Sequence, residues 1–197
     1  THINKLSQLF KLPTLKESNF NYAANFGQYA ETKKPKPLKE TKKLSELIGI
    51  LLGDGNLCHN RIHISFDRRN KGYIKYVLNL FKDLTGITLR YNEIEDTNQA
   101  YLYCYNYLLM DQLNEKGLIK GDKIKNKVSI PNWIKENSFY CKSCVKGLID
   151  TDGCIYFSKR DKQFYIKFTN FNKKLLDDFK DITSKVGYNF AKANKQN

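Results

Sequence analysis

The sequence of 197 residues has no apolar run near the roughly 20 residues that a membrane-spanning helix needs. It also opens without the charged and then apolar pattern of a secretory leader. We therefore expect a protein that is neither embedded in a membrane nor exported, and that works inside the cell, in the cytoplasm or nucleoid or in an organelle matrix. With 41% hydrophobic and 13% aromatic residues, the chain has enough apolar side chains for a globular fold.

Cysteine is scarce and odd in number, with five residues in the chain. Without a leader these thiols are expected to stay reduced, which argues against a disulfide framework. Cys141 and Cys144 form one CxxC pair, but a structural zinc site needs about four ligands. The sequence offers no second pair and no suitably spaced histidines, so we expect no zinc site.

Acidic residues are outnumbered, with 20 Asp and Glu against 34 Lys and Arg, which gives a formal net charge of +14. Such an excess is typical of proteins with an extended anionic partner, and nucleic acid is the commonest one. Charge alone does not distinguish DNA from RNA, or binding from catalysis. Residues 1–43 are expected to form an N-terminal extension whose basic, proline-containing end, residues 33–43, is an extended linker.

The chain contains an internal repeat. Residues 47–55 (LIGILLGDG) resemble residues 145–153 (VKGLIDTDG), and the shift from 47 to 145 is 98 positions. At the same shift, residues 81–85 (FKDLT) match residues 179–183 (FKDIT). Two separate matches at one offset indicate a duplicated unit.

Each unit shows the same order of predicted elements. An apolar helix ends at Asp-Gly, alternating strands follow at 61–66 and 164–169, and helices come next at 73–84 and 173–186. The first unit continues with strands at 87–94 and 100–106 and a helix at 107–115, whereas the second lacks these elements within the sequence. We therefore divide the chain into a first half at 44–117, a linker at 118–137 and an incomplete second half at 138–197.

The spacing of small residues suggests how the repeated helices meet. Gly49 and Gly53 lie four apart on one helical face, as do Gly147 and Thr151, and small residues at this spacing let helix backbones approach closely. Asp54 and Asp152 would then end the helices side by side, where the negative helix termini disfavour two carboxylates. A divalent cation would relieve this conflict, with backbone oxygens of Gly53 and Thr151 as further ligands. The alternative is that each Asp only begins a tight turn, but its duplication favours the metal site.

These two segments resemble the motifs of the LAGLIDADG homing endonucleases, and more narrowly those of single-chain members with two motif-bearing halves. The resemblance implies a mixed α/β (α+β) fold. Two αββαββα units would form a pseudo-two-fold saddle of two antiparallel sheets, with the motif helices at the interface. It also implies that Asp54 and Asp152 are catalytic and bind metal, with backbone oxygens of Gly53 and Thr151 as additional ligands. Leu52 departs from the family motif, which has an aspartate at this position. The second copy keeps this aspartate as Asp150.

The implied function is a site-specific DNA endonuclease, encoded within an intron or intein, that acts as a monomer on double-stranded DNA. Mg²⁺ is the expected cofactor, and Ca²⁺ is expected to be a non-catalytic substitute. One acid in each half would allow one cut in each strand, and so a double-strand break. Two saddle halves that each span about one helical turn imply a target of roughly 20 base pairs.

Polar faces of the strands are the expected DNA-reading surfaces, because Arg, Asn and hydroxyl groups pair with base edges and Lys contacts phosphates. In the first half these residues are Arg61, His63, Ser65, Thr88, Arg90, Asn92, Tyr101, Tyr103 and Tyr105. In the second half they are Tyr156, Ser158, Tyr165, Lys167 and Thr169. Arg68 and Arg69 are further expected DNA contacts. These two arginines and residues 170–173 follow strands near the acids and are also candidates to assist catalysis. Apolar residues on the opposite faces, namely Ile62, Ile64, Phe66, Ile166 and Phe168, are expected to meet the helices.

Two other functions remain open on the sequence. A maturase of the same fold, which binds intron RNA and assists splicing, would keep the charge and both acids. A DNA-binding regulator descended from an endonuclease is less consistent, because both acids are present. An HNH nuclease is not expected, because residues 58–63 (CHNRIH) are too compressed for its metal site and alternate like a strand.

Overall fold

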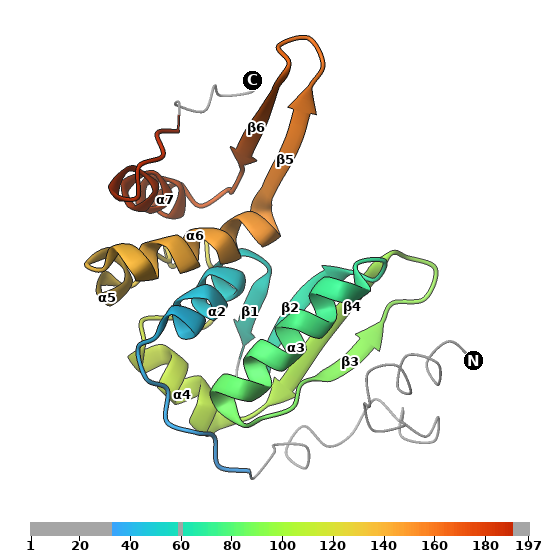
Figure 1. Ribbon diagram of the computed structural model, residues 1–197. Coiled ribbons are helices and arrows are strands. Elements are labelled where there is room, and N and C mark those ends of the chain that lie inside the picture. Colours follow the sequence, from blue (N-terminus) through green and yellow to red (C-terminus); the bar gives the residue numbers. More distant parts are fainter. Residues whose placement is uncertain (1–32, 59–60, 191–197) are drawn as a thin grey trace.

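The computed structural model describes residues 33–58 and 61–190, which form a mixed α/β fold of helices and two antiparallel sheets (Figure 1). The first half has the predicted order αββαββα. Its elements are α2 (Lys42–Gly53), β1 (Gly55–Cys58), β2 (Arg61–Asp67), α3 (Lys71–Thr85), β3 (Arg90–Glu93), β4 (Gln99–Tyr105) and α4 (Tyr107–Glu115).

The second half repeats the first four elements of this order, and the predicted mixed fold class is confirmed. After a short helix α5 (Asn132–Lys135) in the linker come α6 (Ser138–Asp152), β5 (Gly153–Ser158), β6 (Gln163–Phe168) and α7 (Lys173–Lys185). Among the described residues, no helix is long and apolar enough to cross a membrane.

Asparagine residues begin most of the long helices. The side chains of Asn70, Asn106, Asn137 and Asn172 each accept a hydrogen bond from a backbone N–H in the first turn of the helix that follows, and Thr41 does the same for α2. Such caps satisfy N–H groups that have no partner within the helix. Helix α3 ends at Gly86, whose φ of 72° is the left-handed conformation that glycine adopts without strain.

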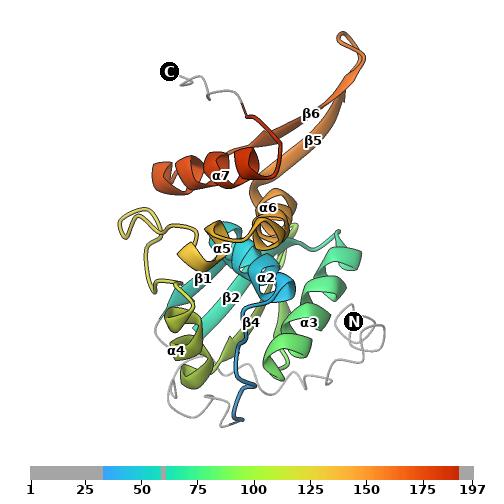
Figure 2. The same ribbon diagram turned by 60° about the vertical axis from the view of Figure 1, so that its left-hand side comes forward.

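The first sheet has four strands in the order β1-β2-β4-β3, and each neighbouring pair is antiparallel. Helices α2, α3 and α4 lie over one face of this sheet (Figure 2). As predicted, Ile62, Ile64 and Phe66 lie on that face, where the two isoleucines are fully buried and Phe66 is 7% exposed. The opposite face carries the polar residues of β2 and β4.

The second sheet is the hairpin β5–β6, which projects away from the helices (Figures 1 and 2). Phe168, at its base, stacks on Phe179 of α7 with 4.0 Å between the ring centroids, as its predicted contact with the helices requires. The same prediction is wrong for Ile166, which is 47% exposed. Ile166 pairs with Ile155 farther along the hairpin, where Phe164 is also 75% exposed, beyond the reach of α7.

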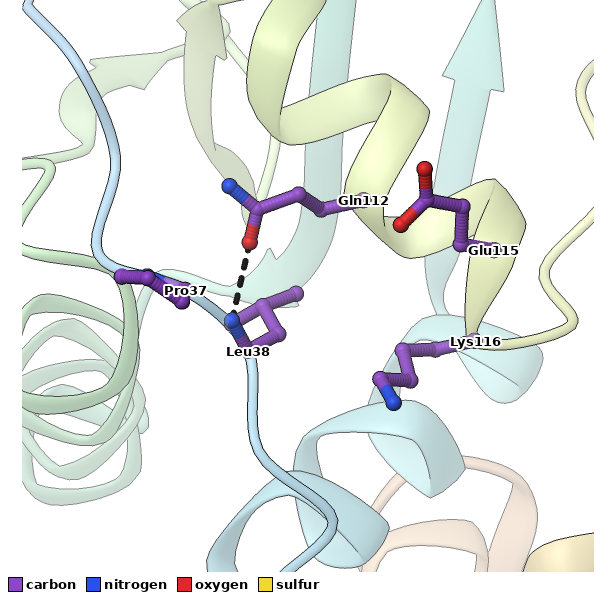
Figure 3. Close-up of a pocket in the computed structure, with 5 residues that line it drawn as sticks. All are labelled: Pro37, Leu38, Gln112, Glu115 and Lys116. Atoms are coloured by element: carbon purple, nitrogen blue, oxygen red, sulfur yellow. Dashed lines mark hydrogen bonds between the residues drawn. The ribbon is translucent and has the colours of Figure 1, made fainter.

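The basic segment before α2 packs against the first half. The Lys36 N–H donates to the Thr85 carbonyl oxygen at 2.8 Å, and the Leu38 N–H donates to Gln112 Oε1 of α4 at 2.9 Å. A shallow depression of about 180 Å³ lies here, at the N-terminal end of α2 (Figure 3). Its lining residues are Pro37, Leu38, Gln112, Glu115 and Lys116. The predicted linker is therefore extended but partly buried as far as Thr41, whereas its last two residues, 42 and 43, already belong to α2. The rest of the N-terminal extension, residues 1–32, lies outside the described residues.

Candidate active site

The two repeated helices, α2 and α6, pack side by side in parallel between the two halves of the molecule (Figure 1). A β-carbon added to Gly147 would lie 2.9 Å from the Ile50 backbone nitrogen, and one added to Gly49 would lie 3.2 Å from the Leu148 nitrogen. Both distances are shorter than ordinary contacts, so glycine permits this approach of the backbones. Polar contacts also join the helices, because Ser45 Oγ donates to the Tyr140 carbonyl oxygen at 2.6 Å.

The parallel packing brings the C-terminal ends of the helices together. Asp54 is the residue that caps α2, and Asp152 is the last residue of α6. The α-carbon of Gly53 faces the second helix, since a β-carbon there would lie 2.7 Å from Thr151 Cβ and 3.4 Å from Asp152 Oδ2. The structure thus places all four predicted metal-site residues at one end of the helix pair.

The two acids also occupy equivalent places in their hairpins. The Ser65 N–H of β2 donates to the Asp54 carbonyl oxygen at 3.1 Å, and the Thr169 N–H donates to the Asp152 carbonyl oxygen at 3.3 Å. Each acid therefore sits where a motif helix turns into its sheet, held by the returning strand. Thr169 itself lies just beyond the end of β6.

The environment of the acid pair disfavours negative charge. Burial raises the pKa of Asp54 to about 6, with a further contribution from the charge of Asp152 and an opposing one from Lys123. Burial also raises the pKa of Asp152, against the hydrogen bond from Asn170 and the charge of Lys123. Ionising two carboxylates with raised pKa values at helix C-termini costs free energy, and a nearby cation would reduce that cost.

Lys123, from the linker between the halves, supplies positive charge at this point. Its Nζ donates to the carbonyl oxygens of Leu52, at 2.8 Å, and Gly53 at the end of α2. The ammonium lies partly buried and within electrostatic range of both Asp54 and Asp152. It thereby offsets both the carboxylates and the negative end of the helix.

The polar face of the first sheet gathers most of the predicted DNA-reading residues. Directly opposite residues in this antiparallel sheet share a face, so Arg61 with Tyr105, His63 with Tyr103 and Ser65 with Tyr101 form one surface. Arg90 and Asn92 of β3 lie on the same surface, because they are directly opposite Tyr103 and Tyr101 in the sheet. Thr88 precedes β3, and Arg68 and Arg69 lie in the turn after β2.

Arg61 is held among the tyrosines of this face. Its guanidinium carbon lies 5.4 Å from the ring centroid of Tyr101 and 5.4 Å from that of Tyr103, which is within cation–π range. Arg61 Nε and His63 Nδ1 are buried and have no hydrogen-bond partner among the described residues. This surface therefore combines a fixed cation, aromatic rings and unused polar atoms.

The hairpin of the second half presents a smaller surface of the same kind. Tyr156 pairs with Tyr165, and their rings stack at 5.5 Å. Lys167 and Ser158 lie on the same face of the hairpin, because each is two residues from one of these tyrosines.

Residues 141–194 match the family model of the LAGLIDADG-like domain. This part of the chain is therefore a LAGLIDADG-like domain. The matched range includes most of α6, both strands of the hairpin and α7, and so it contains Asp152. Asp54 lies outside this range, in the half that repeats the same helix and hairpin.

Two solved structures are similar to this chain. Full-length DUF199/WhiA from Thermatoga maritima is 13% identical, with a TM-score of 0.49, over 74% of this chain and 44% of its own length. Mesophilic variants of the homing endonuclease I-DmoI are 17% identical, with a TM-score of 0.49, over 75% of this chain and 73% of theirs. The chain therefore spans less than half the length of the first of these proteins. No curated protein sequence matches it.

The acid pair fits a hard divalent cation. Carboxylate and carbonyl oxygens are the donors that Mg²⁺ and Ca²⁺ prefer. The Gly53 carbonyl oxygen already accepts a hydrogen bond from the Lys123 ammonium, so it faces a cationic group. Within the described part of the chain, no three His, Cys, Asp or Glu side chains converge on one point. Binding here would therefore depend on two carboxylates together with backbone oxygens.

The candidates for assisting catalysis differ in where they lie. Asn170 Nδ2 donates to Asp152 Oδ2 at 2.6 Å and so belongs to the site. Arg69 is instead paired with Asp67 through several hydrogen bonds, and Arg68 lies 3.7 Å from Glu93. The position of these two arginines after a strand predicts a role at the acids. In the structure they instead contact Glu93 and Asp67, which are carboxylates of the sheet.

Sequence reasoning missed two residues of these surfaces. Lys123 lies in a linker without periodicity or motif, and no local signal marks it. Asn56 pairs with His63 and is exposed on the polar face of the first sheet. Its alternation with buried Leu57 is a usable signal, although β1 is only four residues long.

Proposed function

We propose that this protein is a site-specific, divalent-metal-dependent DNA endonuclease that makes a double-strand break. The observation that carries the proposal is the meeting of Asp54 and Asp152 at the paired C-terminal ends of α2 and α6. A single chain supplies both acids, so the active species is a monomer, with a target of about 20 base pairs read by its sheets. The intron or intein origin that the family resemblance implies is part of this proposal.

In this proposal, Asp54, Asp152 and the backbone oxygens of Gly53 and Thr151 would hold a Mg²⁺ ion. Held there, the ion would supply Lewis-acid stabilisation of negative charge on the phosphate oxygens. The hydrogen bond from Asn170 orients the Asp152 carboxylate. The partly buried position of the acids limits competition from water, which strengthens their interaction with a cation.

The test is cleavage of a library of randomised double-stranded DNA in the presence of Mg²⁺. The parent protein is compared with Asp54→Asn and Asp152→Asn, each of which removes one charge at nearly constant shape. Asp150→Asn is the matched control, because Asp150 lies on the same helix and pairs with Lys146 at 2.9 Å. We expect discrete double-strand cuts by the parent and by the control. Each acid variant should lose them or only nick DNA, with a loss of at least about a hundredfold. A parent that binds DNA but never cuts it would overturn the proposal.

Intron RNA is a second candidate partner, favoured by the tyrosine row on the first sheet. Tyr101, Tyr103 and Tyr105 are successive outward residues of β4, with 5.8 and 5.9 Å between neighbouring ring centroids. Aromatic rows on a sheet suit the stacking of unpaired bases, which structured RNA offers more often than duplex DNA. In this case the protein would prefer folded intron RNA to duplex DNA, and Asp54→Asn would leave that affinity unchanged.

A further inference from the structure

We propose that Lys123 is a positioning residue that competes with the metal for the acid pair, so that metal binding must displace its ammonium from the end of α2. This inference rests on the proposed metal site, which the test below examines separately. Lys123 is not part of either repeated motif, and it comes from the linker that joins the halves.

The contacts of Lys123 overlap with those of the proposed metal site. The ammonium donates to the carbonyl oxygens of Leu51 at 3.4 Å, Leu52 at 2.8 Å and Gly53. Gly53 is one of the expected ligands, and the charges of both Asp54 and Asp152 act on the same ammonium. A divalent cation at these oxygens would meet a unit positive charge at close range, where repulsion is strong in a partly buried site.

The turn that carries Lys123 is fixed by both halves of the molecule. On one side, the Gly121 N–H donates to the Leu57 carbonyl oxygen of β1 at 2.7 Å. On the other, Asn172 Nδ2, at the start of α7, donates to the carbonyl oxygens of Lys123 at 3.3 Å and Val128 at 2.7 Å. The backbone of Lys123 is therefore held in place, and only its flexible four-carbon side chain is free to withdraw from the oxygens.

Two consequences follow from this arrangement. Without metal, the Lys123 ammonium offsets the charge of two carboxylates and of a helix terminus, although burial lowers the pKa of this lysine. With metal, the same charge opposes binding, so the site is occupied only at a higher metal concentration than the acids alone would require. Lys123 thus sets the metal affinity of the site as well as the position of its ligands.

The experiment measures Mn²⁺ affinity by electron paramagnetic resonance, in which free Mn²⁺ gives the signal, and needs no nucleic acid. The variants are Lys123→Met, which keeps the length of the side chain, and Lys123→Gln, which keeps a donor without the charge. Lys125→Met is the matched control, because Lys125 is exposed in the same turn and its loss changes the net charge equally. Comparison with Asp54→Asn identifies the Mn²⁺ that is bound at the acid pair, because this variant lacks one of the two carboxylates. Thermal unfolding in EDTA shows that each variant folds.

We expect both Lys123 variants to bind Mn²⁺ about tenfold more tightly than the parent, the effect of removing a nearby unit charge. Lys125→Met should bind Mn²⁺ like the parent. Unchanged or weaker Mn²⁺ binding in the Lys123 variants, with Asp54→Asn still weakening it, would overturn the competition and leave the metal site standing. Mn²⁺ binding that Asp54→Asn does not change would overturn both proposals. If Lys123→Met does not fold, Lys123→Gln decides between these outcomes.

Discussion

Gly49 of α2 and Gly147 of α6 lie against each other's helix backbones, and neither position has room for a β-carbon. The close approach is what places Asp54 and Asp152 at one end of the helix pair. A wider separation would move the acids apart and expose the apolar residues of α2, among which Leu47 and Ile48 are fully buried. The two glycines therefore connect the stability of the core with the geometry of the candidate site.

Replacing either glycine with alanine is expected to destabilise the protein. The added methyl group would meet backbone atoms that cannot yield locally, so Gly49→Ala or Gly147→Ala should cost about 2 to 3 kcal/mol in the free energy of unfolding. Gly72→Ala is the matched control, because Gly72 lies in helix α3 with nothing within 4 Å of a β-carbon. It should stabilise the protein by up to about 1 kcal/mol through helix propensity. Urea unfolding of the three variants checks this, and equal effects would contradict the close packing.

Much of this arrangement could be predicted because its signals are local in the sequence. The four-residue spacing of Gly49 and Gly53, repeated in Gly147 and Thr151, marks the helix faces that meet. The alternation in β2 and β4 likewise predicts which side chains share a face, and the register pairs Arg61 with Tyr105 as expected for two polar positions.

Other features depend on tertiary contacts that leave no local pattern. Lys123 reaches the acids because Gly121 and Asn172 anchor its turn from opposite halves, and neither contact has a signature in the linker sequence. The prediction that Ile166 contacts the helices is wrong for a different reason. Alternation indicates which face of a strand is apolar, but not whether a helix covers that face along the whole strand.

The stability of the protein should depend on the ionisation of Asp54. Its pKa is raised to about 6 in the folded protein from an ordinary value of 3.8, so the folded state binds more protons than the unfolded state between these values. Stability attributable to Asp54 therefore falls as the pH rises from about 4 to 6 and stays low above that range. Asp54→Asn should remove this loss and stabilise the protein at pH 7.5 by about 1 to 2 kcal/mol, allowing for solvent screening.

Denaturant unfolding of the parent and of Asp54→Asn at several values between pH 4.5 and 7.5 checks this prediction. The difference between the two proteins should grow with pH across the window and then level off. A difference that shrinks as the pH rises would mean that Asp54 is stabilised as a carboxylate, contrary to the effects of burial and of Asp152.

Asp178 is expected to anchor α7 to the linker. Its side chain is 1% exposed, and its Oδ1 lies 2.8 Å from both Lys135 Nζ and Lys174 Nζ. The Ile130 N–H also donates to its Oδ2 at 2.8 Å. These partners lower the pKa of Asp178 although burial opposes them, so the stability it contributes is present at neutral pH and is lost in acid.

Asp178→Ala should therefore cost about 3 kcal/mol at pH 7, because it leaves two lysines and a backbone N–H without their acceptor. Asp177→Ala, at an exposed position of the same helix, should change stability by less than about 0.5 kcal/mol. Thermal unfolding compares the two variants. Equal stabilities would show that the ion pairs around Asp178 contribute nothing beyond the packing of α7.

Arg61 should contribute more to nucleic-acid affinity than Arg69, although both lie near the same sheet. Arg61 is fixed between Tyr101 and Tyr103 on the polar face, whereas Arg69 is neutralised by its pairing with Asp67. Arg61→Ala should weaken binding to duplex DNA by about 1 to 2 kcal/mol, roughly tenfold, and Arg69→Ala by much less. Fluorescence anisotropy at several salt concentrations measures both effects.

Arg61→Lys separates charge from geometry, because lysine keeps the charge but not the planar group that stacks on the tyrosines. If Arg61→Lys binds like the parent, Arg61 acts only through its charge. If Arg69→Ala has the larger effect, the polar face of the first sheet is not the binding surface.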